Sequence, residues 1–311
     1  SSGRKGCAEL TGCANTKKEA EVDVMEITSA MIKDLRERTG AGMMDCKRAL
    51  EASQGDINAA IEYLRKKGAA AGAKRADRAA KEGMIVTRLT SDRKSGVLVE
   101  VNCETDFVGR SEDFAAFART VAEAVAQHRP ASVEALMEAT VNGRKLSELH
   151  NDLLAKVGEK IEVRRFMVYH SEDGVVSAYT HLGNRIGVLV EMTGIGPEAT
   201  ESGVGRDVAM QIAAMNPLVV SREELDKVLI ERELDIYRTQ AANEGKPAHI
   251  AEKIATGRLE KYYQEVVLLE QTFIKDAGKT IKDYLAEAGK ALGRQIVIKR
   301  FQRYHLGEET Q

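Results

Sequence analysis

Two glycine motifs have spacings that suggest phosphate binding, but neither keeps the residues that this chemistry needs. The GKT run at 278–280 resembles the end of a phosphate-binding loop, yet Phe273 stands where that loop requires a glycine five residues before Gly278. The GIGPEA run at 194–199 follows the GxGxxA pattern of a dinucleotide-binding turn. Its Pro197 lacks the backbone N–H that would face a phosphate, so we interpret this run as an ordinary turn.

Signatures of catalysis and of metal binding are also missing from the sequence. Neither HExxH nor GxSxG occurs, and the six histidines are scattered. The four cysteines form no CxxC pair and no Cys/His cluster with zinc spacing; they are Cys7, Cys13, Cys46 and Cys103. The sequence therefore predicts a protein that is not an enzyme, needs no cofactor or metal, and keeps reduced thiols, as cytoplasmic proteins do.

The run Thr105-Asp106-Phe107-Val108 is suited to another kind of chemistry, the recognition of a protein. It lies between a predicted strand and a helix that Ser111 would cap, and it sets an aromatic ring beside a carboxylate. Two interpretations are open. Phe107 is either buried beneath the helix, which composition alone favours, or an exposed wedge that enters the surface of a partner.

Length and composition limit the other possibilities. The chain has 311 residues, enough for two or three domains, and 43 % of them are hydrophobic. Aromatic residues make up only 5 % and Trp is absent, so aliphatic cores are expected. The net charge of −2 provides no global field for nucleic acid or a membrane surface, and no apolar run approaches the ~20 residues of a membrane span.

Residues 1–24 are polar and show no apolar periodicity. Met25 has the character of a natural start, and the acidic Glu9, Glu19, Glu21 and Asp23 are unlike an acid-poor transit peptide. We expect this extension to be disordered or introduced for expression.

Residues 26–67 are predicted to form three short helices that resemble a ubiquitin-associated-type module. The apolar residues share helical faces, and Asp56 is expected to cap the third helix; these faces are Met31 with Leu35, Met43 with Cys46 and Leu50, and Ile57 with Ala60, Ile61 and Leu64. The following segment, 65–81, has seven Lys/Arg and one Asp. It is either a solvated, partly helical linker or a patch that touches RNA, although it lacks aromatic residues for base stacking.

An internal repeat organises the rest of the chain. The pentapeptide GVLVE at 96–100 recurs at 187–191, an offset of 187 − 96 = 91. The same offset pairs residues of a preceding strand and a following helix: Gly83 with Gly174, Phe117 with Val208, Val121 with Ile212 and Ala122 with Ala213. Each copy is therefore predicted to be a β-hairpin followed by a helix. In copy one the helical stripe is Phe114, Phe117, Ala118, Val121, Ala122 and Val125.

The two copies also end alike, with IEVRRF at 161–166 and IVIKRF at 296–301, an offset of 296 − 161 = 135. Helices at 146–157 and 281–292 are expected to precede these strands. The difference, 135 − 91 = 44 residues, indicates an insertion in copy two. Its charged helical runs, 222–242 and 250–270, predict an antiparallel hairpin of roughly 30 Å. An apolar seam is expected along Leu225, Val228, Leu229 and Ile236. This arm either projects or packs back on the body.

The sequence thus predicts an α+β fold: a three-helix ubiquitin-associated-like domain, a duplicated hairpin-helix-strand core with antiparallel sheets, and an inserted antiparallel helical hairpin. The expected parts are an extension at 1–24, the three-helix domain at 25–67, a basic linker at 68–82, core repeat one at 83–170, core repeat two at 171–221 and 272–311, and the arm at 222–271.

Two long motifs in this chain resemble the signatures of the elongation factor Ts family. LRERTGAGMMDCK at 35–47 is similar to the N-terminal signature, and VEVNCETDFV at 99–108 is similar to the second. The resemblance extends over nearly everything from Met25 onward. It implies a nucleotide exchange factor that binds elongation factor Tu, both with GDP and free of nucleotide.

The resemblance also implies which residues act. Asp106 and Phe107, within the 105–108 loop, would enter elongation factor Tu and displace groups that hold Mg²⁺ near the GDP phosphates. Further contacts would come from Arg36, Met43, Met44, His181, Leu182 and Gly183. Met43 remains open between helix core and adaptable surface contact, and His181 between partner contact and an ordinary hairpin-turn residue.

One feature departs from the family pattern, and two functions compete with exchange. Some members carry a further C-terminal helix that grips elongation factor Tu, whereas this chain stops at Gln311, so binding would lean on the arm or on a homodimer formed through it. The alternatives are an interaction scaffold without exchange activity and an RNA-binding protein that uses the segment 65–81. We favour exchange, with no nucleic-acid or membrane partner.

Overall fold

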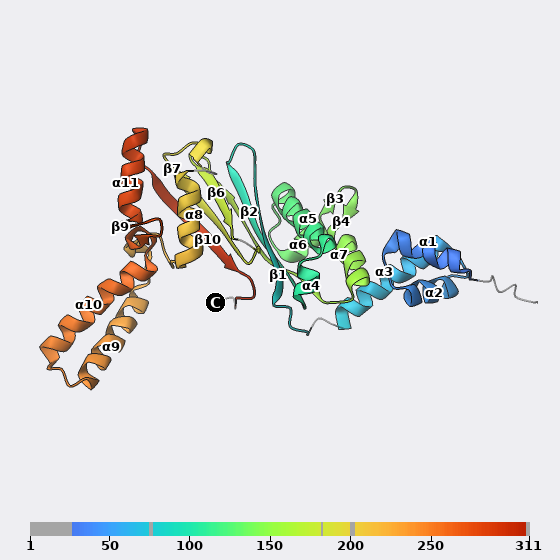
Figure 1. Ribbon diagram of the computed structural model, residues 1–311, viewed down its shortest axis with the longest axis horizontal. Coiled ribbons are helices and arrows are strands. Elements are labelled where there is room, and N and C mark those ends of the chain that lie inside the picture. The colour runs from blue at the N-terminus through green and yellow to red at the C-terminus, as the bar shows by residue number, and fades with distance from the viewer. Residues whose placement is uncertain (1–26, 75–76, 182, 200–202, 309–311) are drawn as a thin grey trace, which may run out of the picture. The chain divides into compact units, whose positions relative to one another are not determined.

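The computed structural model describes residues 27–74, 77–181, 183–199 and 203–308, and it has an α+β fold with antiparallel sheets (Figure 1). The expectations for residues 1–24, with Cys7 and Cys13, and for Leu182 lie outside the described residues. The chain divides into two compact units between Tyr63 and Leu64.

The first unit is built from helices with clear start signals. They are α1 (Ser29–Thr39), α2 (Met43–Ala52) and α3 (Ile57–Lys74), whose C-terminal part belongs to the second unit. Asp56 caps α3 as predicted, because its Oδ1 accepts the N–H of Asn58 at 2.8 Å and that of Ala59 at 3.1 Å. Helix α3 runs on to Lys74, so the first part of the expected linker is helical.

The second unit contains two three-stranded antiparallel sheets with the same strand order. The first sheet is β1 (Glu82–Leu89), β2 (Ser95–Cys103) and β5 (Ile161–His170), and the second is β6 (Val175–Thr180), β7 (Ile186–Thr193) and β10 (Val297–His305). In each, the hairpin supplies the edge and centre and a later strand completes the other edge. The central strands carry the repeated GVLVE motif.

The remaining elements connect and cover these sheets. The helices are α4 (Asp106–Gly109), α5 (Glu112–His128), α6 (Val133–Met137), α7 (Leu146–Val157), α8 (Val204–Met215) and α11 (Ile281–Leu292), with a 3₁₀ turn η1 (Pro197–Ala199). Two short hairpins are β3 (Thr140–Val141) with β4 (Arg144–Lys145) and β8 (Thr272–Phe273) with β9 (Asp276–Thr280). Helices α7 and α11 have the predicted bounds.

The two sheets face each other between α5 and α8 (Figure 1). Alternate residues of β2, namely Val97, Val99 and Val101, pack beneath α5. Leu98 points to the opposite face and joins a second apolar cluster, to which strands of both sheets contribute: Ile85, Leu98, Tyr169, Val176, Leu189, Tyr304 and Leu306. Strand β2 is therefore buried on both faces, which explains why three apolar residues follow one another at 97–99 instead of alternating with polar ones.

Glycine permits the close approach of the sheets at two matching points. A Cβ placed on Gly187 would lie 2.5 Å from Cγ2 of Ile85 and 2.7 Å from Cδ1 of Leu98. A Cβ placed on Gly96 would lie 2.8 Å from Cγ1 of Val176 and 3.2 Å from Cδ2 of Leu189. The glycine that opens each GVLVE motif is thus required by the packing of the other sheet.

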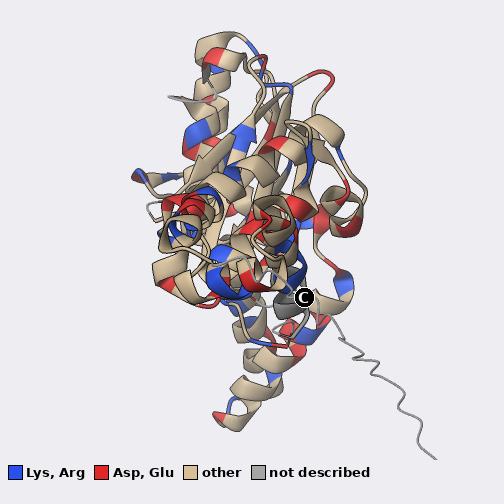
Figure 2. Ribbon diagram, turned by 90° about the vertical axis from the view of Figure 1, so that its right-hand side faces the viewer, with Lys and Arg blue, Asp and Glu red and all other residues tan. Residues whose placement is uncertain are grey.

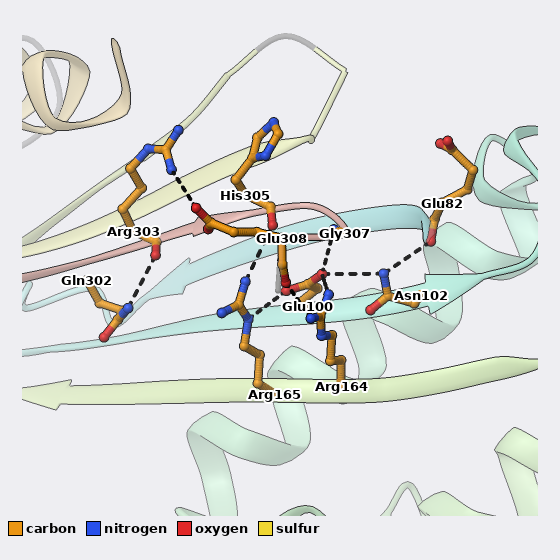
Figure 3. A network of polar contacts seen from close by, with 10 residues as sticks. All are labelled: Glu82, Glu100, Asn102, Arg164, Arg165, Gln302, Arg303, His305, Gly307 and Glu308. Atoms are coloured by element: carbon orange, nitrogen blue, oxygen red, sulfur yellow. Dashed lines mark hydrogen bonds and ion pairs between the residues drawn. The ribbon is translucent and has the colours of Figure 1, made fainter. Parts of the chain in front are cut away.

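A buried carboxylate in β2 connects the first sheet with the chain segment that follows β10 (Figure 3). Glu100 is fully buried; its Oε2 accepts Nε of Arg165 at 2.6 Å, and its Oε1 lies 3.3 Å from Nη1 of Arg164. The same Oε1 accepts the N–H of Gly307 at 3.1 Å. A buried carboxylate is tolerated because cations and hydrogen bonds surround it.

The second sheet repeats this arrangement. Arg300 bonds to Glu191 at 2.7 Å and lies 4.3 Å from the ring centroid of Tyr169 in the first sheet. Arg165, conversely, lies 4.1 Å from the ring centroid of Tyr304 in the second sheet. Each arginine pairs with the glutamate of its own sheet and stacks on the tyrosine of the other, which ties the sheets together.

The inserted segment forms an antiparallel helical hairpin, as predicted. It comprises the 3₁₀ turn η2 (Arg222–Glu224), α9 (Lys227–Asn243), α10 (Ala248–Val266) and the 3₁₀ turn η3 (Leu268–Glu270). At 1.5 Å per residue, helices of 17 and 19 residues span about 26 and 29 Å. Helix α9 packs on α10, and α10 on η3, so among the described residues the arm is held mainly at its base.

The seam of the arm differs in part from expectation. Leu225 is buried with Leu259 and Tyr263, and Leu229 packs against them. Val228 is 70 % exposed and Ile236 is 39 % exposed, so neither belongs to the buried seam.

The arm leaves and rejoins the core at one place. Val219 and Val267 form a parallel bridge, and the N–H of Leu268 donates to the carbonyl of Val219 at 2.9 Å. Beside it, Arg222 pairs with Glu260 at 2.7 Å and with Glu270, and lies over the ring of Tyr263.

Basic residues (Lys and Arg) and acidic residues (Asp and Glu) are interspersed along the ribbon in Figure 2. This mixture agrees with the net charge of −2. In the described part of the chain, no helix combines the length and apolar character needed to cross a membrane.

Gly187→Ala is expected to lower the free energy of unfolding by about 1–3 kcal/mol, because the added methyl overpacks the contact between the sheets. Urea denaturation measures the change. Gly257→Ala is the matched control: its Cβ would meet nothing within 4 Å in α10, so this variant should be as stable as the parent or more so. Equal stability of Gly187→Ala and the parent would contradict the close packing.

Candidate partner-binding surface

The loop 105–108 follows directly from the end of β2. Thr105 caps α4, a single turn, and Ser111 caps α5 immediately afterwards, with its Oγ accepting the N–H of Phe114 at 3.3 Å. Phe107 is the second residue of α4, between these two caps. Its side chain is 84 % exposed, which favours the wedge interpretation over burial beneath the helix.

The neighbours of Phe107 are anchored. Val108 packs against the core beneath α5. Gly109 is buried, and a Cβ there would already be 3.4 Å from both Cys103 Sγ and Gly83 Cα. Thr105 is half-buried and serves as the cap of α4. Within the predicted loop, therefore, Phe107 is the most exposed residue, and Thr105 and Val108 support it.

Asp106 has an ion pair within the loop. Its Oδ2 lies 3.0 Å from Nη2 of Arg110, one helical turn later. The carboxylate also sits in the first turn of α4, where exposed N–H groups favour negative charge. Asp106 is thus held beside the wedge with its charge only partly compensated by solvent-exposed Arg110.

The predicted loop around His181 lies at the turn between β6 and β7, and the structure brings part of it close to Asp106. A hollow of about 470 Å³ is lined from both sides by Asp106, Gly109 and Arg110 and by Gly183, Asn184 and Arg185, with Glu82, Gly83, Met84 and Ala115 between them. The Asn184 carbonyl accepts the N–H of Ile85 at 2.8 Å. Strand β1 therefore holds the two loops together.

Two further residues of this hollow escaped sequence analysis. Arg185 pairs with Glu82 at 2.7 Å, across 103 residues of sequence. Each of the two residues stands next to a predicted feature of the sequence. Their ion pair depends on the contact between the two sheets, which the sequence does not reveal. His181 is exposed, and its Nδ1 lies 3.1 Å from the hydroxyl of Tyr179.

In the first unit, the predicted contact residues are on the surface. Arg36 is exposed near the end of α1, whereas Met43 and Met44 begin α2 and are 56 % and 63 % exposed. Cys46 and Leu50 of the same helix are fully buried. Of the two alternatives left open for Met43, its exposure favours the surface contact over the helix core.

The described residues offer little for covalent or metal chemistry. No cluster of three or more His, Cys, Asp or Glu among them is arranged to hold a metal ion. Burial, followed by the charge of Glu159, raises the pKa of the Cys103 thiol to about 12, so it is not a thiolate at neutral pH. Burial raises the pKa of Cys46 as well.

Both glycine motifs serve the fold. Lys279 and Thr280 end β9, and Thr280 then caps α11 in a capping box with Asp283. Gly194 has a φ of 80°, and a Cβ there would lie 1.9 Å from the carbonyl oxygen of Gln295. Glycine is required at this position by a backbone crossing.

Comparison with known proteins identifies the family. The family model described as elongation factor TS matches residues 104–308. Elongation factor Ts of Chloroherpeton thalassium is 49 % identical over 290 residues, covering 91 % of this chain and 99 % of that protein. The same-named protein of Clostridium botulinum is 47 % identical over 283 residues (91 % and 93 %), and that of Chlorobium limicola is 47 % identical over 288 (91 % and 99 %). The chain therefore belongs to the elongation factor Ts family.

Proposed function

We propose that this protein is a guanine-nucleotide exchange factor that binds elongation factor Tu·GDP and promotes release of GDP during translation elongation. The observation that carries the proposal is the exposure of Phe107 on a turn that Thr105, Val108 and Gly109 anchor. An aromatic ring that is left in water at the tip of a rigid turn is suited to enter a pocket on another protein. This role places the factor in the cytoplasm, where translation proceeds.

The proposed mechanism requires no covalent step. Phe107 and Asp106 enter the nucleotide-binding domain of elongation factor Tu and displace groups that hold Mg²⁺ near the GDP phosphates. Because Mg²⁺ and backbone N–H groups neutralise the phosphate charge, their displacement weakens GDP binding. Linkage makes the effect reciprocal: the factor weakens GDP binding and GDP weakens binding of the factor.

The energy available from the wedge is sufficient for this effect. Full burial of a Phe side chain contributes roughly 1.5–3 kcal/mol. Coupling energies between two ligands are typically about 1–3 kcal/mol, or roughly 5- to 150-fold in affinity. One buried ring can therefore supply a coupling of this size when its pocket is open only in the conformation that holds GDP weakly.

The remaining contacts are proposed to determine affinity. His181, Leu182 and Gly183 would also meet elongation factor Tu, and for Gly183 this is supported by the hollow that it lines together with Asp106. Arg36, Met43 and Met44 would bind it from the three-helix unit, which we take to be a ubiquitin-associated-like domain. We also propose that the core arose by duplication, an idea supported by its matched strand orders and matched glutamate–arginine pairs.

The decisive test measures release of labelled GDP from elongation factor Tu in the presence of catalytic amounts of this protein. Acceleration is expected. If release is not accelerated, the exchange proposal is wrong, and an interaction scaffold would be the better description.

Phe107→Ala is expected to slow the accelerated GDP release by on the order of tenfold to thirtyfold, in line with the loss of one interface hot spot of about 2 kcal/mol. Asp106→Ala with Phe107→Ala should slow it at least as much. Thermal stability should be preserved, because the ring is exposed. Ile274→Ala removes another exposed apolar side chain and serves as the control. Exchange by the double variant at the parent rate would contradict the wedge assignment.

Met43→Ala with Met44→Ala is expected to raise the concentration of factor needed for half-maximal exchange about threefold to tenfold, with little change in the maximum rate. The reason is that these side chains would contribute binding and not displacement of Mg²⁺. Titration of the factor in the GDP-release assay measures both quantities. A fall in thermal stability instead would indicate that the two methionines support the fold.

The exposed apolar residues of α9 support a homodimer through the arm. Val228→Glu with Ile236→Glu is expected to shift the protein from dimer to monomer in sedimentation equilibrium, because a charge at an apolar interface is costly. An unchanged mass distribution for this variant would exclude the arm as the dimer interface.

A further inference from the structure

The position of the wedge depends on the turn that carries it. Phe107 is 84 % exposed, so its ring gains little support from packing. Helix α4 has only four residues, too few to be stable on its own. The direction in which Phe107 points therefore depends on contacts from outside α4: the core beneath Val108 on one side and the group that holds Thr105 on the other.

Glu159 supplies such a group from the turn between α7 and β5. Its Oε2 accepts the backbone N–H of Thr105 at 3.0 Å, and its Oε1 accepts the Thr105 hydroxyl at 2.7 Å. The hydroxyl oxygen in turn accepts the N–H of Val108 at 3.4 Å. One carboxylate thus holds both the backbone at the start of α4 and the side chain that caps it.

A second carboxylate makes the connection in the opposite direction. Oε1 of Glu104 accepts the backbone N–H of Lys160 at 2.6 Å. The main-chain pairing of β2 with β5 ends at Cys103 opposite Ile161. Glu104 and Glu159 therefore continue the cross-connection beyond the last paired residues, where the two segments would otherwise separate.

The second half of the core folds without this pair of carboxylates. At the offset of 91, Glu104 corresponds to Ile195 (104 + 91 = 195), which is buried in the core beneath α8. At the offset of 135, Glu159 corresponds to Arg294 (159 + 135 = 294). The second half also has no aromatic residue in place of Phe107. The carboxylates accompany the wedge and are not required by the sheet.

We propose that Glu159 is a positioning residue for exchange, which holds the 105–108 turn so that Phe107 points at the partner. This inference rests on the proposed function. Without Glu159 the turn samples other directions, while the remaining contact surfaces are unchanged. Loss of the carboxylate therefore lowers the maximum rate of GDP release more than it weakens binding of the factor.

The test compares two substitutions at this position in the GDP-release assay, with labelled GDP on elongation factor Tu. Glu159→Ala removes both acceptors, and the maximum rate at saturating factor is expected to fall about tenfold, with half-maximal concentration changed less than about threefold. Glu159→Gln should retain a rate within about threefold of the parent. Its amide oxygen can accept the Thr105 N–H while its NH₂ donates to the Thr105 hydroxyl oxygen.

Two controls separate positioning from folding and from charge. Glu162→Ala removes the same charge three residues away. Because the Glu162 carboxylate pairs with Lys160, this variant should accelerate GDP release as the parent does. In Glu159→Ala, backbone amide hydrogens of the peptide around Thr105 and Val108 should be replaced by deuterium faster than in the parent, as measured by mass spectrometry. The deuterium uptake of the rest of the core should be unchanged.

A double-mutant cycle distinguishes failure of this inference from failure of the proposed function. If Glu159 acts through Phe107, Glu159→Ala should slow the Phe107→Ala protein no further. If Glu159→Ala accelerates GDP release as well as the parent while Phe107→Ala does not, the positioning role alone is overturned. A further loss of similar size on the Phe107→Ala background would overturn it too. Parent-like exchange by Phe107→Ala would overturn the wedge itself, and the positioning role with it.

Discussion

The core depends on the close approach of its two sheets, which two glycines make possible. Gly96 and Gly187 each face apolar side chains of the opposite sheet at distances that leave no room for a methyl group. The crossed pairs, in which Arg165 stacks on Tyr304 and Arg300 on Tyr169, act at the same interface. Burial raises the pKa of both tyrosines to about 12, so their rings stay neutral beside the cations. The sheets thereby form one rigid support.

That support determines the candidate surface as well. Because β1 of the first sheet lies against the second, the carbonyl of Asn184 can bond to Ile85, and the two loops come to line one hollow. Gly183 and Asp106 are 183 − 106 = 77 residues apart in the sequence, and neither loop is positioned by its own strand alone. Rigid presentation of this kind lowers the entropic cost of binding.

Local features were well predicted from the sequence, whereas features that depend on distant contacts were not. Helices α7 and α11 and the caps Asp56 and Ser111 follow from apolar periodicity and capping chemistry. The exposure of Phe107 remained open, because burial depends on what packs against a residue. Glu159 gave no signal at all, since its bond to Thr105 spans 54 residues. Val228 was wrongly assigned to the buried seam, because helical spacing alone does not identify which side of α9 faces α10.

The base of the arm has a consequence for how such proteins diversify. The chain leaves the core at Val219 and re-enters it at Val267, two residues that pair directly with each other. The strands on either side would meet correctly whatever length of hairpin lay between them. Natural selection can therefore lengthen, shorten or replace this module within a lineage without changing the order of the strands, and new binding specificities can arise on it while the candidate partner-binding surface stays intact.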